Sequence, residues 1–536
     1  MSSAKEPVTR RFGNGLTVLI KEDKSHPVVS LQYWVGTGSM NEGHWQGSGL
    51  SHLLEHLVFK GTAHFSGQEL ARKVQERGGH WNAYTSVNRT VYYIDGPAES
   101  WQIFLNLLTE LVFFPTFPED EMEREKEVVR REMAMYADDP DSVAYQLLMQ
   151  TLYLKHPRRW PVLGERAAFD CLTRQDVLDY HASRYVPNNV VLSIAGDVDA
   201  AEILSHLELL VEDLKSRPLN REPIPHEPHQ FGSRRVRKEF AVPYSKLHLA
   251  WRLPCSAHPD TPALSALSSI LGGGRSARFY EKFHDRLGLV YSIEVHSNQS
   301  ETDEGAFTIS MDVDRAQRDK VRDLVLQELR NLAEEDFTED LKRVCKQTRV
   351  SRLRRRSSAS GVASEMGADW FGSRNLNLSS EWQEAIERVT TEDLHRVCST
   401  WLSSPNVTEV SLDPPGSNAG DEERASASAG TALSEHVLGN GMKVVIREDH
   451  RLPLAYACMA FKAGCRAENE HDAGVTDLMS ECLLKGTSTR SAADIARFLE
   501  DIGGAINTST GNNSLSVGCQ VLAEDLDAGL ELMAGG

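Results

Sequence analysis

Three residues near the N-terminus have the types and spacing of a metal site with its own base. They are His52, Glu55 and His56, in the order H-x-x-E-H. Positions i, i+3 and i+4 of a helix share one face, so the three side chains would project together. Two imidazoles one turn apart can chelate zinc, and the carboxylate between them can take a proton from water at the metal.

The residues around this motif are apolar, which predicts a largely buried helix. They are Leu53, Leu54, Leu57, Val58 and Phe59. Two histidines and a glutamate without partners would be costly in such surroundings, which favours a metal site. The alternative is a pair of hydrogen-bonded core histidines.

A catalytic zinc site usually has three protein ligands, so a third ligand should come from elsewhere in the chain. An acidic helix expected over 119–136 offers five glutamates: Glu121, Glu123, Glu125, Glu127 and Glu132. Glu125 and Glu132 are seven residues apart, close to two helical turns, and therefore lie on one stripe. An acid-rich helix is more often a solvated surface, and spacing alone does not choose among the five carboxylates.

The pattern of apolar residues predicts the elements that position these side chains. In the first part of the chain we expect strands at 16–21, 28–35, 79–85 and 90–95, and helices at 50–60, 68–77, 101–113 and 119–136. A similar order follows, with strands near 234–240, 245–253, 290–297 and 306–313 and helices near 262–284, 316–334 and 338–356. This order predicts an α+β fold of tandem modules, each an antiparallel β-sheet covered by helices on one side.

Two segments have the composition of linkers and divide the chain into three parts. Residues 216–232 contain four prolines, and residues 413–432 are rich in Ser, Ala, Gly and acidic side chains. We therefore expect a catalytic zinc-binding module at 1–215, a non-catalytic scaffold module at 233–412, and a third part at 433–536.

The third part repeats the start of the first. Asn14 recurs as Asn440 and Gly49 recurs as Gly474, so the offset is 440 − 14 = 426 and then 474 − 49 = 425. A nearly constant offset indicates a second copy of one long unit, of which we expect only the opening to be present. The positions of the H-x-x-E-H motif are occupied in this copy by Asp477, Ser480 and Glu481. Without the imidazoles and the base, the second copy is predicted to be non-catalytic.

The overall composition is that of a globular protein and excludes several classes of function. Of the 536 residues 40% are apolar and 25% are charged, and 58 Lys+Arg against 77 Asp+Glu give a net charge of −19. Nucleic-acid backbones and anionic membranes repel so acidic a chain. Without an apolar stretch of membrane-spanning length, and with eight scattered cysteines, we expect neither a membrane span nor a disulfide framework. A soluble, cytoplasmic protein is the expectation.

Taken together, these motifs resemble the pitrilysin/insulinase family of zinc metallopeptidases (M16-type, inverzincins), which includes the mitochondrial processing peptidases. The resemblance rests on the H-x-x-E-H motif, on residues 59–62 after it, on 78–79 and 82–85, and on a glutamate 132 − 56 = 76 residues after the second histidine. In that family such a glutamate binds the metal, and another seven residues earlier supports it. The resemblance implies one zinc ion in the catalytic module, held by His52, His56 and Glu132, with Glu55 as the base and Glu125 in support.

The resemblance also implies how a substrate is bound. Asn82, Ala83, Tyr84 and Thr85 would form an edge strand to which an extended peptide adds through main-chain hydrogen bonds. Taken alone, these four residues could equally be an ordinary edge strand. The family further uses an Arg–Tyr pair in a distant module to stabilise the tetrahedral intermediate. Tyr291 matches the tyrosine of that pair, but His284 stands where the arginine should be.

The implied function is a zinc-dependent endopeptidase that cleaves peptides or short unfolded segments in an enclosed chamber, completed by a second half or a partner chain. Two other functions stay open. A catalytically silent or truncated family member could serve as a structural core subunit, although the metal-binding motif is retained. A small-molecule hydrolase or lyase could share the motif, but the length of the chain and its internal repeat argue against it.

Overall fold

The computed structural model describes residues 6–219, 223–299, 304–402, 405–415, 434–446 and 454–535, except 463, 465, 467, 469–471, 484, 488–489, 503 and 512. The chain forms two compact units, Met1–Asp421 and Glu422–Gly536, and each is described by itself. The expected linker at 413–432 lies outside the described residues from 416 onward. Among the described residues, no helix is long and apolar enough to cross a membrane.

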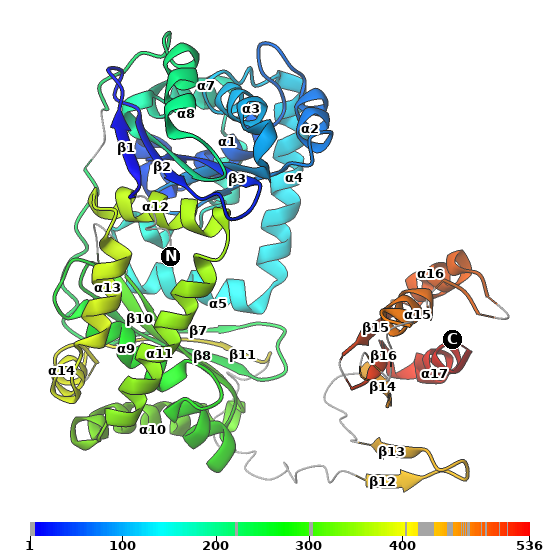
Figure 1. Cartoon of the computed structure of the whole chain (residues 1–536). Coiled ribbons are helices and arrows are strands. Elements are labelled where there is room, and N and C mark those ends of the chain that lie inside the picture. The colour runs from blue at the N-terminus through cyan, green and yellow to red at the C-terminus, as the bar shows by residue number, and fades with distance from the viewer. Residues whose placement is uncertain are drawn as a thin grey trace. The chain divides into compact units, whose positions relative to one another are not determined.

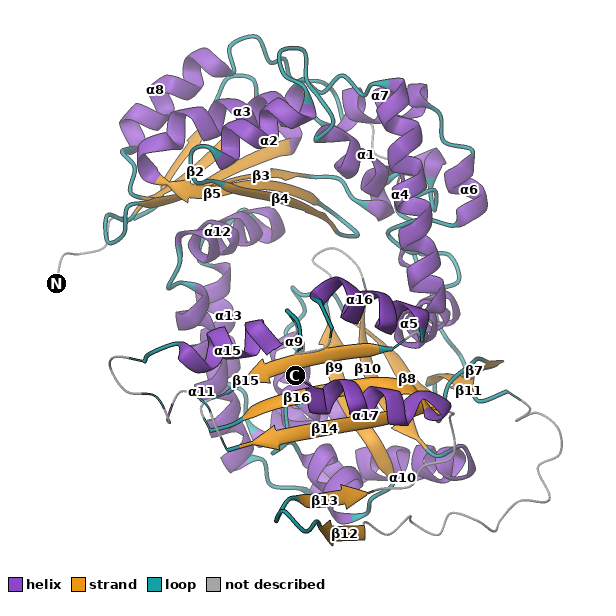
Figure 2. Cartoon of the chain, turned by 90° about the vertical axis from the view of Figure 1, so that its right-hand side faces the viewer, coloured by secondary structure: helices purple, strands orange, loops and turns teal. Residues whose placement is uncertain are grey.

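The first unit contains two sheets, of which the N-terminal one has six strands in the order β1-β2-β6-β3-β5-β4 (Figure 2). These strands are β1 (Val8–Arg11), β2 (Thr17–Glu22), β3 (Val28–Val35), β4 (His80–Thr85), β5 (Thr90–Pro97) and β6 (Val190–Gly196). Neighbours are antiparallel, as expected, except that β6 runs parallel to β2. All residues of β6 are buried, which explains why its apolar run does not alternate.

Helices cover one face of this sheet and form the core that carries the metal-site residues (Figure 2). They are α1 (Leu50–Val58), α2 (Gly67–Gln75), α3 (Trp101–Phe113), α4 (Glu119–Asp138), α6 (Arg166–Asp170), α7 (Arg174–Arg184) and α8 (Ala200–Leu210). In α1 the leucines at positions 50, 53, 54 and 57 recur at helical spacing and are fully buried. Their stripe fixes the rotation of α1 about its axis.

The second sheet of this unit has five strands in the order β7-β11-β8-β10-β9 (Figure 1). The strands are β7 (Arg234–Glu239), β8 (Ser245–Leu253), β9 (Val290–Asn298), β10 (Gly305–Val313) and β11 (Thr408–Asp413), and only β7 and β11 are parallel. Its helices are α9 (Thr261–Gly272), α10 (Arg318–Asn331), α11 (Thr338–Arg355), α13 (Leu378–Glu387) and α14 (Thr391–Val397). The α+β fold class is thus confirmed.

In an exchange of helices, each sheet is covered on its second face by a helix from the other part of the sequence. Both faces of each sheet are therefore covered, whereas the sequence predicted helices on one face. Helix α5 (Pro140–Leu152) follows α4 in the sequence, but it packs on β8 and β11 of the second sheet. Helix α12 (Ala359–Ser373) belongs to the second segment of the sequence, but it packs on β3 and β6 of the first sheet (Figure 2). The sequence boundaries at 215 and 233 stay a prediction, and these contacts run across them.

The strand pattern explains the exchange. Tyr33 and Val35 of β3 face the core with α3 and α8, whereas Trp34 faces the opposite side and packs with Met366 of α12. Helix α12 approaches so closely that a Cβ atom on Gly367 would lie 2.3 Å from the indole of Trp34. A strand that is apolar on both faces needs a cover on both faces, and only a distant helix can supply the second one.

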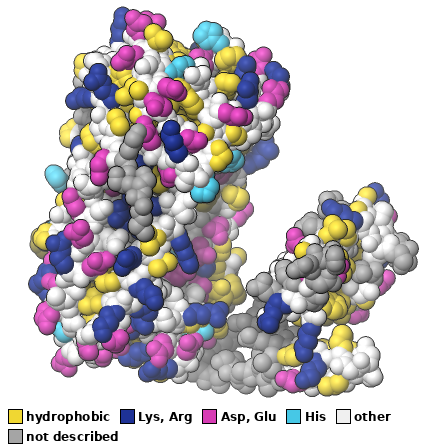
Figure 3. Space-filling model, viewed as in Figure 1, with side chains coloured by type: hydrophobic (Ala, Val, Ile, Leu, Met, Phe, Trp, Pro, Cys, Tyr) yellow, Lys and Arg dark blue, Asp and Glu magenta, His cyan; other side chains and the backbone are white. Residues whose placement is uncertain are grey.

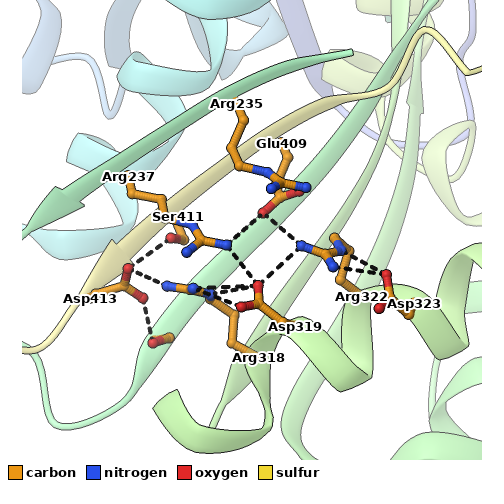
Figure 4. Close-up of polar contacts among 10 residues, drawn as sticks. Arg235, Arg237, Arg318, Asp319, Arg322, Asp323, Glu409, Ser411 and Asp413 are labelled. Atoms are coloured by element: carbon orange, nitrogen blue, oxygen red, sulfur yellow. Dashed lines mark hydrogen bonds and ion pairs between the residues drawn. The ribbon is translucent and has the colours of Figure 1, made fainter. Parts of the chain in front are cut away.

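A network of charged side chains holds α10 against β7 and β11 (Figure 4). Arg318, of which 1% is exposed, donates to the carboxylate of Asp413 at 2.5 Å. Asp413 also accepts hydrogen bonds from the hydroxyls of Ser245 at 2.6 Å and Ser411 at 3.0 Å. Since both charges are removed from water, Asp413 depends on Arg318 for compensation, while Arg318 has the half-exposed Asp319 as a second partner at 3.2 Å.

Replacing Asp413 with alanine should therefore destabilise the first unit by about 3 kcal/mol, because the buried guanidinium of Arg318 would keep only the half-exposed Asp319 as an ionic partner. Urea-induced unfolding followed by circular dichroism measures this loss. The matched control is Glu384→Ala, which breaks a pair with Arg388 whose side chains are 68% and 72% exposed and should cost less than about 1 kcal/mol. Equal losses in the two variants would contradict a stabilising role of the network.

The N-terminus of α1 is anchored by a residue outside the helix. The preceding residue, Gly49, has a φ of 73°, and a Cβ atom there would lie 2.0 Å from the carbonyl oxygen of Leu163. Gly49 has no side chain that could cap the helix. The carboxyl group of Glu42 instead accepts a hydrogen bond from the backbone N–H of Ser51 at 2.8 Å. Burial raises the pKa of Glu42 from 4.5 to about 8, although backbone hydrogen bonds oppose this rise.

This shift gives folding stability a pH dependence of known sign. Between pH 5 and 8 the unfolded chain ionises Glu42 while the folded protein keeps it protonated, so this group lowers stability as the pH rises. Glu42→Gln keeps an oxygen acceptor and does not titrate. Its stability relative to the wild type should therefore rise between pH 5 and pH 8, by up to about 1.4 kcal/mol per pH unit. Urea unfolding at both pH values tests this, with the exposed Glu76→Gln as control, and a constant difference would refute it.

The second unit repeats the order of elements at the start of the first. It consists of β12 (Ser434–Val437), β13 (Lys443–Ile446), β14 (Leu454–Phe461), α15 (Val475–Leu483), α16 (Ala492–Asp501), β15 (Ala505–Thr510), β16 (Leu515–Leu522) and α17 (Leu526–Gly535). The three-stranded sheet has the order β14-β16-β15, which matches β3-β5-β4 of the first unit. The strands β12 and β13 form a separate antiparallel pair.

The helix anchor also recurs in the second unit, whereas the metal-binding motif does not. Glu468 accepts hydrogen bonds from the backbone N–H groups of Gly474 at 2.7 Å and Thr476 at 2.9 Å, at the start of α15. The expected replacements Asp477, Ser480 and Glu481 all lie in α15. The helix is thus present in the second unit without the two histidines and the glutamate of the motif.

Candidate metal centre

Helices α1 and α4 bring together the three residues expected to bind zinc. Nε2 of His52 and Nε2 of His56 each lie 3.8 Å from Oε2 of Glu132. One possible ligand atom from each of the three residues lies within 4.8 Å of the other two. Of the five candidate glutamates on α4, the structure therefore brings Glu132 to the histidines.

The geometry and the protonation state of this cluster fit a zinc ion. Zinc is bound at about 2.0–2.2 Å by histidine nitrogen and carboxylate oxygen, so two ligands of one ion lie about 3–4 Å apart. Burial, with a smaller contribution from the neighbouring His56, lowers the pKa of His52 to about 3. The imidazole of His52 is therefore neutral near pH 7, which is the form that binds metals. His52, His56 and Glu132 could hold the ion without rearrangement of the backbone.

Glu125 orients the second histidine. Its Oε2 lies 3.1 Å from Nδ1 of His56, and because a carboxylate can only accept, Nδ1 must carry the proton. Nε2 of His56 then has a free lone pair on the side of Glu132. Burial works against ionisation of Glu125, but hydrogen bonds from His56 and Lys60 outweigh it and hold the pKa of Glu125 below its ordinary value.

Lys60 is part of this arrangement, although the sequence analysis did not identify it. Its Nζ lies 2.6 Å from Oε1 of Glu125. The signal was present in the sequence, because Lys60 follows His56 by four residues and so lies on the same side of the chain. The lysine balances the charge of a carboxylate that is itself buried.

Glu55 lies on the same helix face as the two histidines and has a partner on strand β4. Its Oε2 accepts a hydrogen bond of 2.5 Å from the hydroxyl of Thr85. Burial raises the pKa of Glu55, and the hydrogen bond from Thr85 opposes the rise. An oriented and partly desolvated carboxyl group with a raised pKa is suited to proton transfer near neutral pH.

The residues expected to bind the substrate lie on an exposed sheet edge next to Glu55. Asn82, Ala83, Tyr84 and Thr85 belong to β4, which pairs with β5 on one side and with no other described strand. Exposure alternates along β4: Asn82 and Tyr84 face outward, whereas Trp81 packs its ring at 4.9 Å from that of Phe59. Main-chain groups on the free edge of β4 are thus placed to pair with another extended segment.

The two residues expected to support an oxyanion are not brought to this cluster. His284 lies in a helical turn, Tyr280–Arg286, where its ring stacks on Tyr280 and its Nδ1 contacts Asp285. Tyr291 is on β9, and its hydroxyl donates to Asp314 at 2.9 Å. The second sheet with its strand β9 is drawn apart from α1 in Figure 2. The contribution of the two residues to an oxyanion site stays a prediction.

Comparisons with protein families match most of the chain. The insulinase family (peptidase family M16) matches residues 17–166 and again residues 443–535, so the metal-binding part and the third part correspond to the same family domain. The family domain described as the peptidase M16 inactive domain matches residues 172–347. This inactive domain covers the helices and strands that follow the metal centre and most of the second segment.

Individual relatives match between about half and three quarters of the chain. The chain is 27% identical over 406 residues to an uncharacterized zinc protease of Rickettsia felis, covering 74% of this chain and 94% of the relative. It is 30% identical over 299 residues to an uncharacterized zinc protease of Mycobacterium bovis, covering 54% of this chain and 67% of the relative. The crystal structure of a protease from Helicobacter pylori superposes with a TM-score of 0.70 at 26% identity, over 76% of this chain and all of that one. The family resemblance inferred from the sequence is confirmed: the chain belongs to the insulinase family of peptidases, peptidase family M16.

Proposed function

We propose that this chain is a zinc-dependent endopeptidase that cleaves peptides or short unfolded segments held in extended form. The observation that carries the proposal is the partly buried group of His52, His56 and Glu132, with Glu55 on the same helix face. The naming of relatives from two bacteria as zinc proteases supports the class of reaction. The free edge of β4 beside Glu55 supports an extended substrate.

Each residue of the site has a separate role in peptide hydrolysis. A zinc ion held by His52, His56 and Glu132 would supply Lewis-acid chemistry, lowering the pKa of a water molecule and polarising the scissile carbonyl. Glu55 takes the proton from the attacking water and delivers it to the leaving amine. Thr85 holds the carboxyl group of Glu55 in place, and the main chain of β4 aligns the substrate. Glu125 keeps His56 in the required orientation.

A second half or a partner chain would complete an enclosed chamber around this site. His284 lies in the helical segment Tyr280–Arg286 and Tyr291 on β9 of the second sheet, and neither contacts the His52–His56–Glu132 cluster. We therefore expect the groups that stabilise the tetrahedral oxyanion to come from the completing part. Such a chamber would admit substrates according to size and lack of folded structure.

A catalytically silent structural subunit is the second candidate. It is favoured by the match of residues 172–347 to a domain described as inactive and by the loss of the motif in α15. It is disfavoured by the retention of a complete ligand set with its base in the first unit. The two candidates differ in whether the zinc-loaded chain cleaves a peptide.

The first test separates metal binding from catalysis. The wild type should bind about one zinc ion at the first unit and cleave a quenched unstructured peptide. Glu55→Gln should keep the zinc and lose at least about 100-fold in kcat, because the base is gone. His52→Ala should lose the zinc itself. The control is Glu123→Gln, an exposed glutamate on α4, which should change neither property. Zinc content is measured by elemental analysis: a wild type without zinc would refute the proposal, and zinc without cleavage would favour the structural subunit.

The second test concerns the orientation of His56. Glu125→Gln should weaken zinc binding by about 10–100-fold, because the amide is a poorer acceptor for the Nδ1–H of His56 and no longer compensates Lys60. Competition with a chelator of known affinity measures the change. Glu123→Gln again serves as the control on the same helix. Unchanged zinc affinity in Glu125→Gln would mean that Glu125 does not position the ligand.

A further inference from the structure

A cavity of about 710 Å³ lies at one end of the first sheet and shares no residue with the metal centre. Its walls are formed by the starts of β2 and β6, at Thr17 and Val190, and by Gly36 just after β3. The C-terminal end of the exchanged helix α12 closes it with residues 370–374. The cavity therefore exists only because α12 is docked on this sheet. Its volume is within the range of small-molecule sites, about 300–1,000 Å³.

The charge of this cavity is opposite in sign to that of the protein. Arg11 and Arg374 line it, and no aspartate, glutamate or lysine does. Neither arginine forms an ion pair with any residue that the structure describes. The whole chain has 77 acidic and 58 basic residues, and on the face seen in Figure 3 the two kinds are interspersed. The described lining of the cavity is therefore positively charged, unlike the mixed surface seen in that figure.

Arg11 and Arg374 line the same cavity, and the charge of one acts on the other. Burial and then the positive charge of Arg11 lower the pKa of Arg374. Two cations that repel each other raise the free energy of the empty site, and an anion placed between them would remove this cost.

Arg374 is held in a backbone conformation that disfavours it. It ends α12 with φ 59° and ψ 20°, and its backbone N–H donates to the carbonyl of Trp370 at 2.9 Å. Glycine or asparagine is usual at such a helix end, and another residue costs about 1–2 kcal/mol in this region. Among the described residues only Phe117 and Arg374 are non-glycine residues with positive φ. Backbone strain is typically retained at functional sites. The strain at Arg374, whose side chain lines the cavity, therefore indicates that this side chain takes part in binding.

The remaining lining determines what kind of anion fits. Trp370 and Phe371 provide aromatic surface at the α12 end, and the amides of Asn41 and Asn88 provide uncharged polar groups. A guanidinium binds carboxylate or phosphate with paired hydrogen bonds and stacks on planar groups. We propose that this cavity binds a small organic anion in which a carboxylate or a phosphate is attached to a planar apolar body. This site is independent of the proposed peptidase activity.

The test uses the full chain and two anionic probes, each with a neutral counterpart. Adenosine monophosphate is compared with adenosine, and N-acetylphenylalanine is compared with its amide, by isothermal titration calorimetry at low salt. At least one anion should bind, and its neutral counterpart should bind at least about tenfold more weakly. Which anion binds distinguishes phosphate from carboxylate. Absence of binding by both anions up to about 10 mM, or equal binding by the neutral counterparts, would overturn the proposal.

Two variants locate the binding in this cavity. Arg374→Asn removes the charge and tolerates the left-handed conformation, so it should fold at least as well as the wild type. Arg11→Gln removes the second charge from an exposed position on β1. Each should weaken binding by about tenfold, and the double variant should abolish it. Arg388→Gln, an exposed arginine on the loop after α13, is the matched control and should bind as the wild type does. Thermal unfolding verifies that the variants are folded, and unchanged affinity in the folded double variant would place the anion elsewhere.

Discussion

The burial of one helix is the constraint on which the candidate site depends. Six of the nine residues of α1 are buried, and the histidines and Glu55 project from its remaining side. A polar group in such a place is tolerated only if it has a partner, because its desolvation is otherwise uncompensated. Several polar groups of α1 accordingly contact another element: Glu55 contacts β4, His56 contacts α4, and the backbone of the first turn contacts Glu42. Nδ1 of His52 is the exception, because it is buried without a hydrogen-bond partner among the described residues. The geometry of the metal centre is therefore a consequence of how the apolar side of α1 is packed.

The second sheet takes part in this positioning although it carries no metal ligand. Glu132 and Glu125 lie on α4, and α4 is followed within two residues by α5, which is packed on β8 and β11. The far end of α4 is therefore fixed by the second sheet, while Glu125 and Glu132 meet α1 of the first. The second sheet thus helps to set the direction of the helix that brings Glu132 to the two histidines.

The sequence predicted local features well and non-local ones poorly. The shared helix face of His52, Glu55 and His56 and most strands and helices up to residue 136 could be inferred, because spacing along one helix or strand is local information. Glu132 could be chosen among five carboxylates only through the family resemblance, since its proximity to α1 depends on how two helices pack. The central strand β6 and the exchange of α5 and α12 escaped notice for the same reason. An apolar face on a strand shows that something covers it, but not which helix does so.

The exchange of α12 also has a consequence for the order of events during synthesis on the ribosome. The last strand of the first sheet ends at Gly196, and α12 begins at Ala359, so some 160 residues separate the sheet from its second cover. At a synthesis rate of about 5–20 residues per second, α12 is made on the order of 10–30 s after β6. Until then the indole of Trp34 has no helix to pack against. For that time the nascent chain presents an uncovered apolar sheet face, which is a natural point of engagement for chaperones.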